Sequence, residues 1–297
     1  MSAVEAPAWF REALAAPVER GVVRVAGVPI VWRAWGGPRA GEPGQDLVLV
    51  HGGAAHGGGW DHIGPRLASD RRVVALDLSG HGDSGAREDY SADAWADEIE
   101  AVAEDAGVGS HPMIVGHSLG GLVSLRVARR ASLAPAGVIV VDSPMSSSFA
   151  HARATERIKT GPHKTYATPD EVLARFRPVP NQHMLPYVRD HIAAASIREV
   201  EGRWTWKFDH GVFPTTANVP DRIDDLDCPV VLLAAEHGLL ADEYRRSRVL
   251  PEDGAAIVLL PDAGHAPMLD RPLALLAAIE GVISGWATTR ILAAARA

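Results

Sequence analysis

The sequence predicts an α/β fold, with a mostly parallel, doubly wound sheet and a helical insertion. Short apolar runs alternate with longer helical patterns up to residue 142, and the same alternation returns over residues 229–283. Between them, residues 144–215 carry several prolines, helical stretches and an aromatic cluster. Alternating strands and helices place helices on both faces of a parallel sheet. We therefore expect a core of residues 1–143 and 216–297, interrupted by the insertion.

The elements of the first half follow one another closely along the chain. A short leading helix is expected over residues 7–17, and Gly27-Val28-Pro29 should join the first two strands as a hairpin. The predicted strands are Val22–Val25, Ile30–Trp35, Leu47–Val50, Val73–Leu76, Met113–Val115 and Gly137–Val141. The predicted helices are Trp60–Ala68, Ala92–Ala106 with Ser91 as its N-cap, and Leu119–Arg130.

The second half of the chain contains the insertion and the end of the sheet. Helical stretches are expected within the insertion at Pro169–Phe176 and Pro186–Ile197. The strand pattern returns at Pro229–Ala235, and Ala255–Leu260 is the last predicted strand. A final helix is expected from about Pro272 to Ile283.

The composition excludes several classes of protein. The chain has 297 residues, of which 47% are hydrophobic, which is enough for a sizeable core. A net charge of −8 with scattered arginines argues against nucleic acid and anionic membranes as partners. No secretory signal or membrane span is visible, so we expect a cytoplasmic protein with a small-molecule substrate. The composition leaves the oligomeric state open.

The segment Gly116-His117-Ser118-Leu119-Gly120 carries the strongest chemical signal. It follows the apolar run Met113–Val115 and precedes a helical pattern, which gives strand, sharp turn and helix with a serine at the turn. A G-x-S-x-G turn in this context exposes the serine hydroxyl above the sheet. Side chains two positions before or after the serine would collide with neighbouring backbone, which explains the two glycines.

Four segments together resemble the α/β-hydrolase superfamily over nearly the whole chain. They are His51-Gly52-Gly53, Asp77 to Ser84, Gly116 to Gly120, and Gly264-His265 after the last strand. The resemblance implies an α/β-hydrolase fold, in which the insertion forms a helical cap over the active site. Within the superfamily, the chain is similar to the capped esterase, lactonase and epoxide-hydrolase-like branch.

The resemblance also implies roles for individual residues. Ser118 would be the nucleophile and His265 the base, because the histidine directly follows the final strand. The backbone N–H groups of Leu119 and Gly53 would form the oxyanion hole, with Ala54 as the alternative to Gly53. A serine nucleophile counts against epoxide hydrolase and haloalkane dehalogenase activity, whose family nucleophile is a carboxylate. We expect no cofactor and no metal.

The acid of the catalytic triad is less clear, because the sequence departs there from the commonest family pattern. Most members place the acid after the next-to-last strand, where this chain has Gly238 or Leu239. Some members instead use an aspartate at the end of the strand that follows the elbow helix, and here that strand ends in Asp142. Because the C-terminal ends of adjacent strands converge, we predict Asp142 as the acid, with Glu236 and then Asp242 as alternatives.

Two further groups of residues are open to a functional or a structural interpretation. Pockets under caps are mostly apolar, so bulky side chains near the predicted site are candidates for substrate binding, with ordinary packing as the alternative. These candidates are Trp60, Met145, Trp204, Trp206, Phe213 and Met268. The polar residues of Asp77 to Ser84 could suggest a metal site, but we interpret the segment as a structural loop. His51 is expected to support the oxyanion loop.

These observations predict a serine-dependent hydrolase that cleaves a carboxylic ester or a lactone of a moderately apolar small molecule. The same triad could instead hydrolyse a carbon–carbon bond or carry out perhydrolysis. A third possibility is a ligand receptor that keeps the hydrolase scaffold without turnover, although the pairing of Ser118 with His265 disfavours it.

Overall fold

A mixed sheet of eight strands forms the centre of the computed structural model, which describes residues 5–37, 45–130, 132–145, 164–217, 223, 225–247 and 255–294. The strand order is β1-β2-β4-β3-β5-β6-β9-β10. The strands are β1 (Glu19–Val25), β2 (Val28–Trp35), β3 (Leu47–Val50), β4 (Val73–Leu76), β5 (Met113–His117), β6 (Gly137–Val141), β9 (Val230–His237) and β10 (Ala256–Gly264).

The sheet is parallel over most of its width. β1 pairs with β2 and β2 with β4 in antiparallel fashion, whereas the pairs from β4 through β3, β5, β6 and β9 to β10 are all parallel. The segments that follow β3, β5, β6 and β10 therefore meet at one edge of the sheet, which is where ligands bind in open α/β sheets.

Successive residues of the central strands enter two different cores. In β3, Leu47 and Leu49 belong to one buried cluster (the first cluster), and Val48 and Val50 belong to another (the second cluster). All four side chains are fully buried. Because side chains alternate across a strand, this pattern means that both faces of the sheet are covered.

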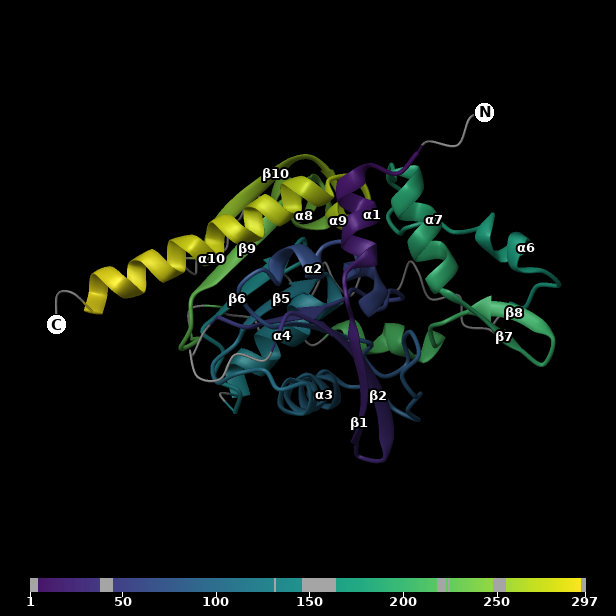
Figure 1. Ribbon diagram of the computed structural model, residues 1–297, viewed down its shortest axis with the longest axis horizontal. Coiled ribbons are helices and arrows are strands. Elements are labelled where there is room, and N and C mark those ends of the chain that lie inside the picture. Colours follow the sequence, from purple (N-terminus) through teal and green to yellow (C-terminus); the bar gives the residue numbers. More distant parts are fainter. Residues whose placement is uncertain are drawn as a thin grey trace.

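Helices supply that cover on both faces. On one face, the first cluster includes side chains from α1 (Ala8–Ala15), α2 (Gly64–Leu67) and α10 (Pro272–Ala294), among other helices. The second cluster includes side chains from α3 (Ala92–Asp105) and α4 (Leu119–Arg130). Figure 1 shows α10 and α3 on opposite sides of the sheet. The doubly wound α/β architecture that the sequence predicts is therefore the one observed.

The described part of the insertion contains a small sheet as well as helices. The two predicted helices are observed as α6 (Pro169–Leu173) and α7 (Pro186–Ala195), which end before the predicted Phe176 and Ile197. The structure adds an antiparallel pair, β7 (Ile197–Val200) and β8 (Arg203–Trp206). A 3₁₀ segment, η2 (His210–Ala217), follows. The insertion is thus not purely helical, because the apolar–polar alternation in Trp204-Thr205-Trp206 is a strand pattern. Residues 146–163 lie outside the described residues.

Polar contacts attach the insertion to the rest of the chain. His191 of α7 lies 3.1 Å from the Asp61 carboxylate. After β8, the Lys207 ammonium lies 2.8 Å from Asp83. Gln182, which precedes α7, hydrogen-bonds the backbone next to His265.

A few predicted elements differ from the observed ones. The sequence predicts one helix over Trp60–Ala68. The structure instead has a 3₁₀ turn, η1 (Gly57–Trp60), followed by a separate short helix, α2, with a proline in its first turn. Two short helices are absent from the prediction, namely α8 (Leu239–Ser247) and α9 (Pro267–Asp270). The strands β9 and β10 both extend beyond their predicted ends, and β10 has a register irregularity between Leu260 and Gly264.

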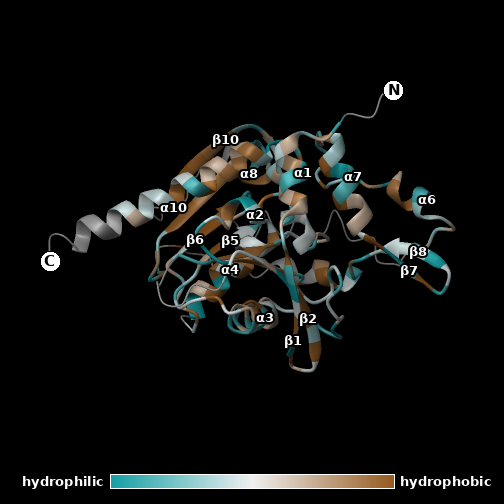
Figure 2. Cartoon of the chain, viewed as in Figure 1, coloured by the Kyte–Doolittle hydropathy of each residue, from teal (hydrophilic) through white to brown (hydrophobic). Residues whose placement is uncertain are grey.

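The edge strand β10 is the most apolar exposed part of the described sheet. Figure 2 shows a long hydrophobic stretch along it, and Ile257, Val258 and Leu259 are 41%, 36% and 55% exposed. Among the described residues, no helix is both long enough and apolar enough to cross a membrane.

Candidate active site

Ser118 stands at a sharp turn between β5 and α4. Its φ angle is +52°, which is a strained backbone conformation for a residue with a side chain. Its N–H donates to the Val141 carbonyl of the neighbouring strand at 2.9 Å. A Cβ added to Gly116 would lie 2.4 Å from the Gly120 carbonyl oxygen, and one added to Gly120 would lie 2.5 Å from the Val50 carbonyl oxygen. Both glycines are therefore required by close backbone approaches, as the sequence predicts.

His265 connects Ser118 to Asp142. The His265 Nδ1 atom lies 2.8 Å from Asp142 Oδ2, and Nε2 lies 3.1 Å from Ser118 Oγ. Because a carboxylate only accepts hydrogen bonds, this arrangement assigns the proton to Nδ1 and leaves Nε2 to accept from the serine hydroxyl. The His265 and Asp142 side chains are 6% and 0% exposed. The structure thus brings together the three residues predicted as nucleophile, base and acid.

The Asp142 carboxylate is held by backbone amides as well as by the imidazole. It accepts from the N–H groups of Ala235, Leu239 and Leu240 at 3.1, 2.7 and 3.3 Å. The last two amides belong to the first turn of α8, whose unpaired N–H groups favour an anion. A Cβ on Gly238 would lie 2.2 Å from Asp142 Oδ2, so the glycine leaves room for this carboxylate.

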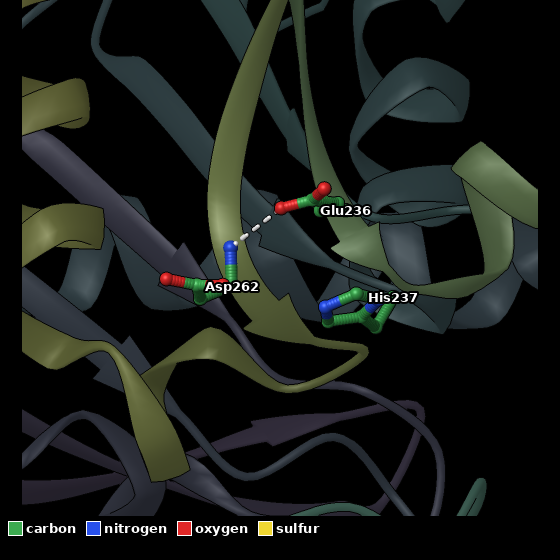
Figure 3. A group of neighbouring side chains, drawn as sticks. All are labelled: Glu236, His237 and Asp262. Carbon is green, nitrogen blue, oxygen red and sulfur yellow. Dashed lines mark hydrogen bonds between the residues drawn. The ribbon is translucent and has the colours of Figure 1, made fainter.

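Glu236, the alternative acid, is engaged elsewhere. Its Oε2 atom accepts from the Asp262 N–H at 2.8 Å, across the irregular end of β10 (Figure 3). With His237, these residues place one possible ligand atom each within 4.8 Å of one another, but Glu236 is half-buried and the other two are exposed. Exposed groups of this kind occur commonly without a metal, and the Glu236 carboxylate already accepts a hydrogen bond from the Asp262 N–H.

Gly53 and Leu119, the residues predicted to supply the oxyanion donors, are close neighbours. A Cβ added to Gly53 would be 3.9 Å from the Leu119 side chain. Ala54, the alternative to Gly53, has a φ angle of +58°, which marks a tight turn in the loop after β3. His51 fixes the start of this loop: its Nε2 accepts from the Leu78 N–H at 3.0 Å and its Nδ1 donates to the Gly52 carbonyl at 2.7 Å. His51 therefore supports the loop in the way the sequence suggests.

His117 lies between the loop after β3 and His265. Its ring centroid is 4.8 Å from that of His265, and its Nε2 donates to the His265 carbonyl at 2.8 Å. A Cβ on Gly52 would lie 2.7 Å from His117 Nδ1, so the ring also lies against this loop. Burial and the neighbouring His265 lower the pKa of His117 to about 3, which keeps the ring neutral near pH 7.

The candidate substrate-binding residues occupy varied environments. Trp60 and Met268 are buried in the first cluster, at 1% and 6% exposure. Trp206 faces Phe176 with ring centroids 6.1 Å apart, and Phe213 packs against the second cluster. The two remaining candidates are Trp204, whose backbone pairs with Tyr166, and Met145, whose N–H donates to Glu243. Contact of any of them with a substrate stays a prediction.

The segment Asp77 to Ser84 is held by hydrogen bonds within itself and to neighbouring backbone. Asp77 accepts from the N–H groups of Gly57 and Asp83 at 2.6 and 2.9 Å. The Ser84 hydroxyl donates to the Asp77 carbonyl and accepts from the Val31 N–H. These contacts fit the structural loop that the sequence suggests.

Three residues near Ser118, Asp142 and His265 make contacts that the sequence does not predict. Gly238 makes room for Asp142, His117 binds the His265 carbonyl, and Gln182 binds the backbone of Ala266. The glycine is visible in the sequence as a missing carboxylate at the usual acid position. Gln182 gives no such signal, because its contact joins segments 84 residues apart.

Comparison with known proteins identifies the family. A sequence model of the alpha/beta hydrolase family matches residues 47–279, which includes Ser118, Asp142 and His265. The chain belongs to this family.

Curated relatives include several esterases. An esterase of Mycobacterium tuberculosis is 26% identical over 279 residues, covering 88% of this chain and 89% of the relative. A pimeloyl-[acyl-carrier protein] methyl ester esterase of Sodalis glossinidius is 41% identical over 99 residues, covering 33% of this chain and 37% of that protein. The bovine protein phosphatase methylesterase 1 is 31% identical over 137 residues, covering 43% and 36%. The last two matches span little more than a third of the relatives' length.

Solved structures of the same fold cover nearly the whole chain. An E-2-(acetamidomethylene)succinate hydrolase superposes with a TM-score of 0.74 at 22% identity, covering 90% of this chain and all of the other. The thioesterase domain from the curacin biosynthetic pathway gives a TM-score of 0.71 at 22% identity, covering 89% and 99%. At this identity, the two structures establish the fold of the family and nothing narrower.

Proposed function

We propose that the protein is a serine hydrolase that cleaves a carboxylic ester, or its cyclic form, a lactone, of a moderately apolar small molecule. The observation that carries the proposal is the hydrogen-bonded series from Ser118 through His265 to Asp142. Such a series activates a hydroxyl that is otherwise a weak nucleophile, because the imidazole removes its proton as the bond to carbon forms.

In the proposed first half-reaction, Ser118 Oγ attacks the carbonyl carbon and His265 Nε2 takes the hydroxyl proton. Asp142 stabilises the resulting imidazolium through Nδ1. The N–H groups of Gly53 and Leu119 hold the negative oxygen of the tetrahedral intermediate. Loss of one such donor typically costs about 3–4 kcal/mol of transition-state stabilisation. The imidazolium returns its proton to the leaving alcohol, and an acyl-enzyme remains.

In the second half-reaction, His265 removes a proton from water, which attacks the acyl-enzyme and releases the acid. Ser118 regains its proton from His265, so the cycle needs no cofactor or metal. The insertion of residues 144–215 acts in this proposal as a cap that limits the size of the substrate. The apolar candidates in and below it would contact the acyl or alcohol group.

The names of the relatives favour an ester over the other bonds that this triad can cleave. The relative that covers nearly the whole chain is an esterase, and the two partial matches act on methyl esters. No comparable observation favours carbon–carbon hydrolysis, perhydrolysis or a receptor without turnover.

The first test replaces the proposed nucleophile. Ser118→Ala should lower kcat on a p-nitrophenyl ester by at least 10³-fold, because only the oxyanion donors and substrate binding would remain. A fluorophosphonate probe should label the wild type at Ser118, as mapped by peptide mass spectrometry. Circular dichroism should show that the variant remains folded.

Ser132→Ala is a matched control, since Ser132 follows the C-terminal end of α4, whereas Ser118 precedes its N-terminal end, and its exposed hydroxyl donates to Glu100 of α3. It should retain full activity and full labelling. If Ser118→Ala kept about a tenth of the wild-type rate, or if the probe labelled another serine, the proposed mechanism would be wrong.

A further inference from the structure

The backbone on both sides of His265 is held by side chains from other parts of the chain. The Gly264 N–H donates to Asp270 Oδ2 at 2.7 Å. The His265 carbonyl accepts from His117 at 2.8 Å. Both polar groups of the next residue, Ala266, bind the Gln182 side chain. The loop therefore takes its position from contacts outside itself.

Gln182 contributes two hydrogen bonds in opposite directions. The Ala266 N–H donates to Gln182 Oε1 at 2.8 Å, and Gln182 Nε2 donates to the Ala266 carbonyl at 3.0 Å. A primary amide can complete this pair because it carries one acceptor and one donor side by side. The side chain thus substitutes for a neighbouring strand at a point where β10 has ended.

The same side chain also lies across Gly264. A Cβ on Gly264 would be 2.8 Å from Gln182 Cδ and 2.9 Å from Gln182 Cβ. Gln182 therefore touches the residues before and after His265, and Gly264 leaves the space that this contact needs. Three residues later, the Leu185 N–H donates to the Leu269 carbonyl at 2.9 Å, which continues the contact between the insertion and this part of the chain.

We propose that Gln182 is a positioning residue: it couples the insertion to the loop of His265, so that the imidazole meets Ser118 and Asp142 together. This inference rests on the proposed hydrolase function. Without the amide, the loop would keep its contacts to His117 and Asp270 but lose both side-chain hydrogen bonds to Ala266. A displacement of about 1 Å in a catalytic group can reduce a rate by about a hundredfold.

The experiment compares two variants of Gln182 with a control elsewhere on the insertion. Gln182→Met keeps the length of the side chain and its packing on Gly264 but removes both hydrogen bonds. Gln182→Glu keeps an acceptor for the Ala266 N–H but sets a carboxylate oxygen against the Ala266 carbonyl. Lys207→Met removes another contact between the insertion and the core, the ion pair with Asp83. For each, kcat, KM, the rate of fluorophosphonate labelling and Tm are measured.

We expect Gln182→Met to lower kcat and the labelling rate by about ten- to a hundredfold, with KM within threefold of the wild type. Gln182→Glu should be at least as impaired near pH 7.5. Lys207→Met should stay within twofold in both rates. A purely structural contact would lower Tm without changing kcat of the folded enzyme.

The proposal is overturned if Gln182→Met keeps kcat within twofold, or if only KM changes. It is also overturned if Lys207→Met lowers both rates as much as Gln182→Met does. Should Gln182→Met not fold, Gln182→Asn gives the same test, because its shorter amide cannot reach both groups of Ala266. Failure of the hydrolase proposal itself would appear separately, as an unlabelled wild type or an active Ser118→Ala.

Discussion

Asp142 and Gly238 depend on each other at the level of single residues. Asp142 directly follows β6, and the glycine after β9 leaves the volume that its carboxylate fills. The sequence indicates both, as an aspartate at a strand end and a missing carboxylate at the common position. It does not indicate the amides of Leu239 and Leu240, because backbone N–H groups leave no signal in the side-chain pattern.

Replacement of Asp142 tests the role of the acid. Asp142→Asn keeps the shape but presents an amide to His265, which favours the wrong imidazole tautomer. The same change in a serine protease costs about 10⁴ in kcat, so we expect a loss of about 10² to 10⁴. Steady-state kinetics on the ester substrate measure it.

Two matched variants separate the acid from its surroundings. Glu236→Gln should change kcat less than threefold, because Gln can still accept from the Asp262 N–H. Gly238→Ala leaves the residue at position 142 unchanged, but its methyl group would displace the Asp142 carboxylate, so kcat should fall. A silent Asp142→Asn together with an impaired Glu236→Gln would assign the acid to Glu236.

The elements that the sequence predicts best are those with a short, fully buried apolar run. β3, β4 and β6 begin and end at the predicted residues. The hairpin of β7 and β8 is not predicted, because its strands are short and a sequence pattern does not show which segments pair with each other. The docking of Gln182 is missed for the same reason: it depends on tertiary contacts, which periodicity does not report.

The strand–turn–helix around Ser118 should be sensitive to a single methyl group. In Gly120→Ala the new Cβ would lie 2.5 Å from the His51 and Val50 carbonyl oxygens, which are backbone atoms that cannot rotate away. We expect destabilisation of about 3 kcal/mol, and a Tm lower by roughly 6–12 °C. Thermal unfolding followed by circular dichroism gives the value.

Gly281→Ala is the matched control in a helix. Nothing lies within 4 Å of a Cβ added to Gly281 in α10, so alanine should stabilise the protein by about 0.5–1 kcal/mol. Equal effects of the two changes would mean that the close approach at Gly120 does not constrain the turn.

At the scale of the whole molecule, buried histidines link stability to pH. Burial lowers the pKa of four histidines from 6.5 to about 3 or 4, and each is at most 6% exposed. They are His51, His62, His81 and His117. In the folded protein these rings stay neutral at a pH where the unfolded chain already binds protons. Their contribution is therefore complete above pH 6.5 and is lost as the pH falls below it.

Acid should thus unfold the protein well before most carboxylates are protonated. Once a histidine is protonated in the unfolded chain but not in the folded protein, it lowers the free energy of unfolding by about 1.4 kcal/mol per pH unit. Burial raises the pKa of Glu98 and Asp270, so these two carboxyl groups bind protons more readily in the folded protein than in the unfolded chain. They can therefore offset up to two of the protons that the histidines of the unfolded chain bind. We expect the free energy of unfolding to fall by about 3–5 kcal/mol per pH unit below pH 5.5, measured by urea titrations between pH 7.5 and 5.

His62→Gln tests this account away from the triad. His62 donates through Nε2 to the Met268 carbonyl at 2.9 Å, a bond that a glutamine amide can supply without a titrating group. The variant should be less sensitive to acid by about 1.4 kcal/mol per pH unit below pH 5.5, whatever its stability at pH 7.5. An unchanged pH slope would show that His62 is protonated in the folded protein, and that its burial does not contribute to acid unfolding.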